Sequence, residues 1–218
     1  MAIDFRLYLI TDRKVATKPL PEAVRLALEG GVRAVQLREK DLPVRELLSL
    51  ARELRAITRE YGAKLFINDR VDVAVAVDAD GVHLGHQSML VEGARKVVGK
   101  DMLIGVSTHS IDEALAAQRG GADLITFGPV YEIPSKLQHG IPVGMDVMKK
   151  VNIEVDIPIY ALGGVKRGNI RSLFGAGFYG VAMISAIFGV EDITHETRKM
   201  LDGIGLIEKI VCQECGRR

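Results

Sequence analysis

The segment Gln36-Leu37-Arg38-Glu39-Lys40 carries the residue types best suited to chemistry and directly follows a short apolar run. Side chains on a strand alternate between two faces, so Gln36, Arg38 and Lys40 are expected to project together. Leu37 and Glu39 then point the other way. An amide and two cations at the end of a buried strand form a good receptor for a phosphorylated ligand. The alternative is a solvated strand end with two ordinary surface cations.

Length and charge restrict the class of protein. A chain of 218 residues, 48% of them hydrophobic, can bury one large core, as in a single α/β barrel. The 29 basic and 28 acidic residues are mixed along the chain, which argues against a nucleic-acid binder with a basic stripe. No apolar run reaches the roughly 20 residues of a membrane span, and the first residues do not resemble a signal peptide. We expect a cytoplasmic protein that binds neither nucleic acid nor membrane. Its oligomeric state stays open, a homo-oligomer included.

Two cysteines, Cys212 and Cys215, lie close together near the end of the chain, so a fold built on disulfides is excluded. A single C-x-x-C supplies half of a four-ligand zinc site. His109, His139 or the same segment of a second subunit would have to complete it. The alternative is a frayed terminus with two ordinary thiols.

Short apolar segments that end in polar or glycine residues recur along the chain. There are eight, roughly 25 residues apart, which is the repeat typical of a (β/α)8 barrel. They lie at residues 7–10, 34–35, 65–67, 81–84, 103–106, 124–127, 157–162 and 180–184. We therefore predict a single (β/α)8 TIM barrel over residues 1–208 and a C-terminal tail at 209–218. A doubly wound open sheet is the alternative, but no G-x-G-x-x-G follows the first segment.

Amphipathic patterns fill the gaps between these segments. Residues 21–29 and 47–57 place apolar side chains three and four positions apart, as on one face of a helix. Ser110 is expected to cap a helix that begins at residue 111. Glycines at 30–31 and 120–121 precede the next strand, where glycine can close a helix in the left-handed conformation.

The carboxyl ends of the strands of a barrel share one rim, which is where active sites form. Asn68 and Asp69 follow the third apolar segment and offer oxygen ligands suited to Mg²⁺. For Asp69, capping of a helix over residues 71–77 is the competing interpretation.

Backbone groups after the seventh and eighth segments are expected to hold a phosphate. Gly163-Gly164 and Ile184-Ser185-Ala186 occupy the usual phosphate site of such barrels, where free N–H groups need no cation. Two tight turns are the alternative. The loop at residues 128–136 is long enough to fold over the rim and return Lys136 to the site. One cationic and one backbone anion site suggest two phosphorylated substrates or one bisphosphate.

Seven motifs occur in order between Leu7 and Ile187: Q-L-R-E-K, F-I-N-D-R-V-D-V-A, D-G-V-H-L-G, G-V-S-T-H-S, F-G-P-V-Y…S-K, A-L-G-G-V and A-M-I-S-A-I. Each is weak alone, but the ordered set resembles the family of thiamine-phosphate synthase and thiazole tautomerase. The resemblance implies a transferase of thiamine biosynthesis, built as a TIM barrel and dependent on Mg²⁺. It implies that hydroxymethylpyrimidine diphosphate condenses with a thiazole phosphate and that diphosphate is released.

The resemblance also implies roles for single residues. The substrate-binding positions are Gln36, Arg38, Lys40, Asn68, Ser107, Ser135, Lys136, Gly164, Ile184 and Ser185. Among them Arg38, Lys40 and Lys136 are the catalytic candidates, because cations there would neutralise the departing diphosphate. The positions that match the magnesium site are Asp69 and Ser88, beside Asn68.

The chain departs from the pattern of each branch of the family. Ser88 stands where the synthase has a second magnesium carboxylate, so water or Glu92 would have to substitute. Ile133 and Ser135 stand where the loop usually has two threonines. The tautomerase also lacks that carboxylate, but its catalytic histidine is replaced here by Pro129. The retained cations and amides favour a synthase. A tautomerase-like isomerase and a non-catalytic paralogue that binds thiazole phosphate are the alternatives.

Overall fold

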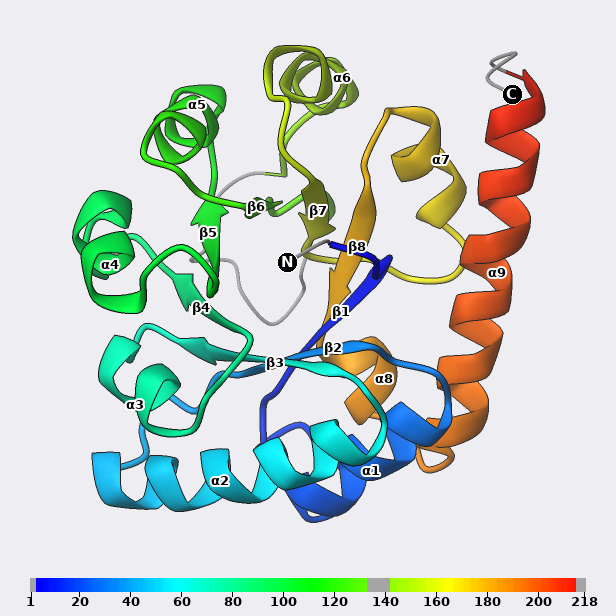
Figure 1. Ribbon diagram of the computed structural model, residues 1–218. Coiled ribbons are helices and arrows are strands. Elements are labelled where there is room, and N and C mark those ends of the chain that lie inside the picture. The colour runs from blue at the N-terminus through cyan, green and yellow to red at the C-terminus, as the bar shows by residue number, and fades with distance from the viewer. Residues whose placement is uncertain (1–2, 133–141, 215–218) are drawn as a thin grey trace.

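The computed structural model describes residues 3–132 and 142–214. Eight parallel strands close into a barrel in sequence order, with β8 hydrogen-bonded to β1 (Figure 1). The strands are β1 (Leu7–Ile10), β2 (Ala34–Leu37), β3 (Lys64–Asn68), β4 (Gly81–Leu84), β5 (Leu103–Thr108), β6 (Leu124–Phe127), β7 (Ile159–Leu162) and β8 (Gly180–Met183). The predicted (β/α)8 barrel is therefore confirmed, and the doubly wound open sheet is wrong.

Helices alternate with the strands and surround the barrel (Figure 1). They are α1 (Leu20–Glu29), α2 (Val44–Glu60), α3 (Val71–Ala76), α4 (Val91–Val98), α5 (Ile111–Arg119), α6 (Met145–Glu154), α7 (Ile170–Gly175), α8 (Ser185–Phe188) and α9 (Ile193–Glu214). The long helix α9 packs against α1, α7 and α8 on the outside of the barrel. The predicted boundary between barrel and tail, at residues 208 and 209, falls inside α9.

Alternation along the strands divides the core into two layers. Val35 and Leu37 of β2 face outward and join the large apolar layer between the barrel and its helices. Ala34 faces inward and joins a smaller cluster that fills the barrel, together with the rings of Tyr8 and Phe66, whose centroids lie 5.1 Å apart. Apolar inward-facing residues come early in β2 to β6, and polar ones come later. The polar interior therefore lies toward the carboxyl ends of the strands.

Two strand glycines leave space for rings inside the barrel. A Cβ on Gly81 would lie 2.3 Å from the ring of Phe66, and one on Gly105 would lie 2.5 Å from Nδ1 of His83. No real Cβ is accommodated at such distances, so glycine on one strand makes room for a ring on the neighbouring strand. The interior packing thus depends on matched small and large residues.

Helix ends follow the predicted chemistry. Oγ of Ser110 accepts a hydrogen bond from the N–H of Glu113 at 3.2 Å, and the Glu113 carboxylate accepts one from the N–H of His109 at 2.7 Å. The two bonds cap α5 in a way that resembles a capping box, with the carboxylate bound to the N–H of the residue before the N-cap Ser110. After α1 and α5 the second glycine is left-handed, with φ of 112° at Gly31 and 90° at Gly121. Each chain reversal is therefore short and brings the next strand back to the barrel.

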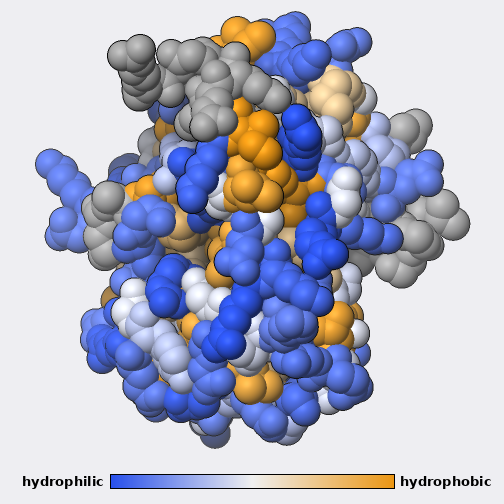
Figure 2. Space-filling view, turned by 90° about the vertical axis from the view of Figure 1, so that its right-hand side faces the viewer, coloured by the Kyte–Doolittle hydropathy of each residue, from blue (hydrophilic) through white to orange (hydrophobic). Residues whose placement is uncertain are grey.

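The outer face that carries α9 mixes charged and apolar side chains (Figure 2). Hydrophobic surface gathers in its upper half, and Leu206 of α9 is 61% exposed. Within the described residues, no helix combines the length and the hydropathy needed to cross a membrane.

Candidate active site

The strand ends bring the predicted site residues to one rim of the barrel. Gln36 lies in β2, Asn68 ends β3, and Ser107 is the penultimate residue of β5. Gly164 and Ser185 each follow their strand, β7 and β8, by two residues. Because all eight strands run parallel in a closed barrel, these five positions share the rim formed by the carboxyl ends.

The strand β2 ends earlier than the alternation argument assumed. Gln36 points into the barrel and is 1% exposed, whereas Leu37 packs in the outer layer, as predicted. The strand ends at Leu37, so Arg38 and Lys40 lie in the following loop and do not continue its alternation. Arg38 is half-buried and Lys40 is exposed. Loop geometry rather than the pleat of a strand therefore directs these two cations.

The acidic residue of this segment, Glu39, forms an ion pair with an arginine from the loop after β1. Glu39 is 6% exposed, and its carboxylate accepts hydrogen bonds from the backbone N–H of Arg13 at 3.1 Å and from its guanidinium at 3.0 Å. Arg13 also donates to Asp41 at 2.6 Å and holds the pKa of that carboxyl well below its usual range. The backbone N–H of Arg38 donates to Oγ1 of Thr11 at 2.8 Å. Glu39 thus pairs with Arg13 and not with its neighbour Arg38.

A chain of hydrogen bonds that sequence reasoning missed crosses the barrel interior. Nε2 of Gln36 donates to Oη of Tyr8 at 3.1 Å, and Tyr8 Oη lies 3.3 Å from Nδ1 of His83. Nε2 of His83 lies 3.0 Å from Oγ of Ser107. The hydrogen-bonded chain therefore links two predicted substrate-binding residues, Gln36 and Ser107, through Tyr8 and His83, which were not predicted. The available signal was a tyrosine in L-Y-L-I and a histidine in G-V-H-L, two polar rings within apolar segments.

The interior chain consists of uncharged groups. His83 is 1% exposed, and desolvation by burial lowers its pKa to about 3, an effect that the positive charge of Arg38 reinforces. Burial likewise raises the pKa of the Tyr8 hydroxyl well above its ordinary value.

The neutral His83 predicts how stability depends on pH. In the unfolded chain His83 takes up a proton near its ordinary pKa of 6.5, whereas the folded protein resists protonation down to about pH 3. The free energy of unfolding should therefore fall as the pH drops below 6.5, by up to about 1.4 kcal/mol per pH unit from this group. Urea unfolding of the parent and of His83→Gln, at about pH 7 and about pH 5, measures the effect. The variant should lose less stability on acidification, and equal losses would contradict this account.

The turn after β3 holds Asp69 in an unusual backbone conformation. Asp69 has φ 65°, and its N–H donates to the carbonyl of His83 at 2.8 Å. The left-handed region is tolerated by aspartate better than by most residues. The N-cap of α3 is Arg70, and the N–H of Val71 donates to the backbone carbonyl of Asp69 at 3.0 Å and not to its side chain, so the competing interpretation of Asp69 as a side-chain cap is wrong. Asp69 is instead an exposed carboxylate at the rim.

The predicted metal positions supply oxygen donors alone. Oγ of Ser88 accepts a hydrogen bond from the N–H of Gly85 at 2.7 Å, which leaves it a second lone pair. Asn68 contributes an amide oxygen and Asp69 a carboxylate. In the described part of the chain, no three His, Cys, Asp or Glu side chains cluster as metal ligands. This donor set fits Mg²⁺ held through one carboxylate, waters and substrate phosphates, and it does not fit a closed protein cage.

Gly164 occupies a position that glycine alone fits. Its φ is 64°, and a Cβ would lie 2.7 Å from Cβ of Tyr131 and 2.8 Å from the carbonyl oxygen of Glu132. The close approach arises because the loop after β6 returns to this turn, where Tyr131 N–H donates to the carbonyl of Gly163 at 3.1 Å. The turn at Gly164 is therefore fixed by its neighbours.

The backbone N–H groups of Gly164 and Ser185 form no hydrogen bond to an acceptor within residues 3–132 and 142–214. Ser185 is exposed, and the preceding Ile184 is half-buried against the interior cluster. Two N–H groups at one rim that have no acceptor among the described residues suit an anionic ligand, as the sequence predicted.

Some predictions fall on residues outside the described ranges. These residues are Ser135, Lys136, His139 and Cys215. Cys212 lies within the span of α9. The loop cation and the zinc site therefore stay predictions.

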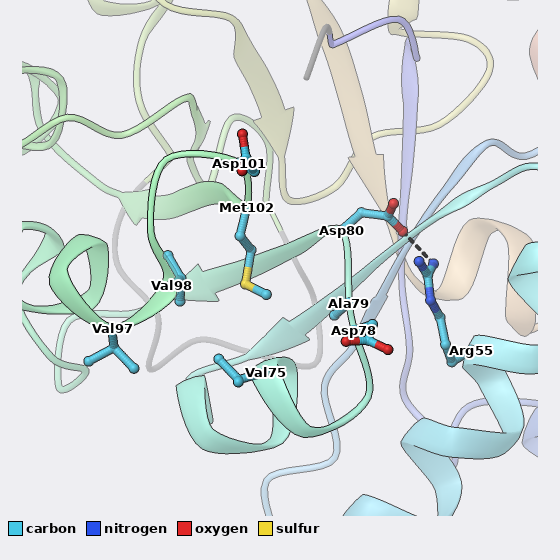
Figure 3. Close-up of a pocket in the computed structure, with 9 residues that line it drawn as sticks. All are labelled: Arg55, Val75, Asp78, Ala79, Asp80, Val97, Val98, Asp101 and Met102. Carbon is cyan, nitrogen blue, oxygen red and sulfur yellow. Dashed lines mark hydrogen bonds and ion pairs between the residues drawn. The ribbon is translucent and has the colours of Figure 1, made fainter.

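A hollow of about 360 Å³ lies at the other end of the barrel, between α3 and α4 (Figure 3). Asp80 and Met102 line it, and they directly precede β4 and β5. Asp80 accepts hydrogen bonds from the guanidinium of Arg55 at 2.6 Å and from the N–H of Leu65 at 2.8 Å. The ion pair thus joins α2 to the beginnings of the strands. The hollow belongs to the amino-terminal end of the barrel and not to the rim.

Comparisons with known proteins agree on one family. The family model described as thiamine monophosphate synthase matches residues 7–187. A relative from Geobacter sulfurreducens is 53% identical over 91% of this chain and 94% of its own length. A thiamine-phosphate synthase from Pyrococcus furiosus is 43% identical over 91% of this chain and 96% of its own. The solved structure of a thiamine phosphate pyrophosphorylase from Pyrococcus furiosus matches with a TM-score of 0.85 at 40% identity, covering 93% of this chain and 96% of that one.

The matched region runs from the first residue of β1 into α8 and includes every rim position described above. The resemblance carried by the seven motifs is thereby confirmed over the whole barrel. On this identity, coverage and fold, the chain belongs to the thiamine-phosphate synthase family.

Proposed function

We propose that this chain condenses hydroxymethylpyrimidine diphosphate with thiazole phosphate and releases diphosphate. The observation that carries the proposal is the convergence, on one rim, of the interior pair Gln36 and Ser107, the cation Arg38 and the amides of Gly164 and Ser185. These three parts suit a ring, a leaving diphosphate and a second phosphate. Membership of a family with relatives named thiamine-phosphate synthase supports the same reaction. We place the reaction in the cytoplasm, in line with the composition of the chain.

The reaction exchanges one bond at the methylene carbon of the pyrimidine for another. The carbon–oxygen bond breaks, and diphosphate leaves with the bonding electrons. The lone pair of the thiazole nitrogen then forms the new carbon–nitrogen bond. Arg38 and Lys40 in the loop after β2, and Lys136 of the loop after β6, would stabilise the charge that develops on the diphosphate. No covalent bond to the protein is needed.

Positioning is the second task of the site. Gln36 and Ser107 would hold the pyrimidine ring by hydrogen bonds from inside the barrel. The backbone at Gly164, Ile184 and Ser185 would hold the thiazole phosphate at the other side of the rim. Fixing both partners lets the thiazole nitrogen approach the methylene carbon without the entropic cost of a bimolecular encounter.

The proposal includes Mg²⁺, which Asp69 and Ser88 would hold beside Asn68. A bound Mg²⁺ would help to neutralise the diphosphate by Lewis-acid interaction with its oxygens. Since Ser88 offers a hydroxyl in place of a carboxylate, we expect a weaker affinity for the ion than in a site with two carboxylates.

A single assay separates the three candidate functions. The protein is incubated with the pyrimidine diphosphate, thiazole phosphate and Mg²⁺, and diphosphate release is followed together with isomerisation of the thiazole. We expect diphosphate release that matches the amount of condensed product. Isomerisation without release would instead select the tautomerase-like function. Binding of thiazole phosphate without turnover would select the non-catalytic paralogue.

A further inference from the structure

The hydrogen-bonded chain inside the barrel connects two pairs of neighbouring strands, β1 with β2 and β4 with β5, through one contact across the interior between Tyr8 and His83. Gln36 on β2 contacts Tyr8 on β1, and Tyr8 contacts His83 on β4, which contacts Ser107 on β5. Tyr8, Gln36 and His83 are at most 1% exposed, whereas Ser107 is half-buried at the rim. The chain thus runs between two residues that reach the proposed pyrimidine site and is otherwise sealed from solvent.

The protons of this chain can be assigned one after another. The Tyr8 hydroxyl accepts from Nε2 of Gln36, and donation of its own single proton to Nδ1 of His83 is the arrangement in which both buried groups have a partner. A histidine that accepts at Nδ1 carries its proton on Nε2, which then donates to Oγ of Ser107. Thr126 also donates to Oγ of Ser107, at 3.4 Å. The protein therefore uses the lone pairs of Ser107 and leaves its proton for a group at the rim.

Packing holds the two rings of the chain in place. Phe66 packs edge-on against Tyr8 with centroids 5.1 Å apart. Gly105 leaves the space that the His83 ring fills, since a Cβ there would lie 2.5 Å from Nδ1. With the opposite tautomer of His83, the buried proton of Tyr8 would have no acceptor in this hydrogen-bonded chain unless the Gln36 amide also turned over. The order of the protons is therefore a property of all four hydrogen-bonded residues together and not of one residue.

We propose that Tyr8 and His83 are positioning residues that make Ser107 a hydrogen-bond donor and Gln36 an acceptor toward the pyrimidine. Nε2 of Gln36 is held by Tyr8, so its carbonyl oxygen is left for the ligand. A ring that accepts from Ser107 and donates to Gln36 matches this order. An aminopyrimidine does so through a ring nitrogen and its amino group, whereas the 4-oxo analogue presents the reverse pattern. The inference rests on the proposed function for the identity of the ring.

Substitution of Tyr8 by phenylalanine tests the proposal, because it removes the hydroxyl and keeps the ring. We expect the KM for the pyrimidine diphosphate to rise about tenfold, with the KM for thiazole phosphate unchanged. The preference for the 4-amino over the 4-oxo pyrimidine diphosphate should fall by a similar factor. Tyr160→Phe is the matched control, since Tyr160 is also an interior tyrosine, but its hydroxyl donates to the carbonyl of Phe5 at 2.7 Å. Equal effects of the two variants on discrimination would overturn the proposal.

A second measurement does not depend on turnover. Nitrogen NMR of the protein labelled at histidine, with the His83 signal assigned through His83→Gln, reports which ring nitrogen carries the proton. We expect Nε2 to be protonated and Nδ1 to be bare in the protein without ligand. A proton on Nδ1 would refute the inference even if the protein is an active synthase. A parent without diphosphate release but with the expected tautomer would refute the proposed function and leave the proton order intact.

Discussion

Replacing Gly164 with valine is expected to abolish binding of thiazole phosphate while the barrel stays folded. Valine at φ 64° is strained by about 1–3 kcal/mol, and its Cβ would lie 2.7 Å from Tyr131. The turn would relieve the clash by rotating, which would turn the N–H of residue 164 away from the phosphate. We expect the affinity for thiazole phosphate, measured by calorimetric titration, to fall about a hundredfold or more.

Gly168→Val is the matched control for this experiment. Gly168 lies in the same loop between β7 and α7, but a Cβ there would meet no atom within 4 Å. This variant should bind thiazole phosphate as the parent does, and thermal unfolding followed by circular dichroism should show both variants to be folded. If Gly164→Val bound thiazole phosphate with unchanged affinity, the backbone at Gly164 would not be part of the phosphate site.

The barrel could be predicted from the sequence because its determinants are local and repeated. Each apolar segment ends in a polar or glycine residue, and that pattern marks both a buried parallel strand and the end that faces the rim. The predicted segments at 7–10, 81–84 and 124–127 coincide with β1, β4 and β6. The capping role of Ser110 followed from residue type alone. Rim positions such as Gln36, Ser107 and Gly164 then followed from strand order.

The interior chain could not be predicted, because it depends on which side chains meet across the barrel. Periodicity shows that Tyr8 and His83 face inward, but it does not show that they meet Gln36 and Ser107 there. The same limit applies to Arg38 and Lys40, whose directions the pleat of a strand does not set. Alternation was extended past Leu37, where the hydrogen-bonded ladder of β2 ends. The left-handed turn at Asp69 is likewise set by its hydrogen bond to His83 on the next strand.

A second large effect is expected at Ser88, the position where the family pattern has a magnesium-binding carboxylate. Ser88→Asp is expected to lower the Mg²⁺ concentration needed for half-maximal diphosphate release by about tenfold, since it adds an anionic oxygen ligand for a hard cation. The Ser88 hydroxyl now accepts the N–H of Gly85 at 2.7 Å. One oxygen of an aspartate can keep that hydrogen bond while the other faces the ion. Ser88→Asn is the matched control, because it offers a similar shape and the same acceptor without the charge.

Arg38→Ala, measured in the same titrations, tests whether the charge of Arg38 stabilises the departing diphosphate. We expect kcat for diphosphate release to fall about a hundredfold at saturating Mg²⁺, because charge developing on the diphosphate loses a fixed partner. Arg33→Ala is its control, since Arg33 is an exposed arginine just before the beginning of β2, at the other end of the barrel. A silent Arg38→Ala beside an active parent would contradict the mechanism.

An inactive parent rescued by Ser88→Asp and not by Ser88→Asn would show that the substrate sites are intact and that metal binding limits the reaction. An inactive parent that neither variant rescues would mean that the chain has abandoned pyrimidine chemistry.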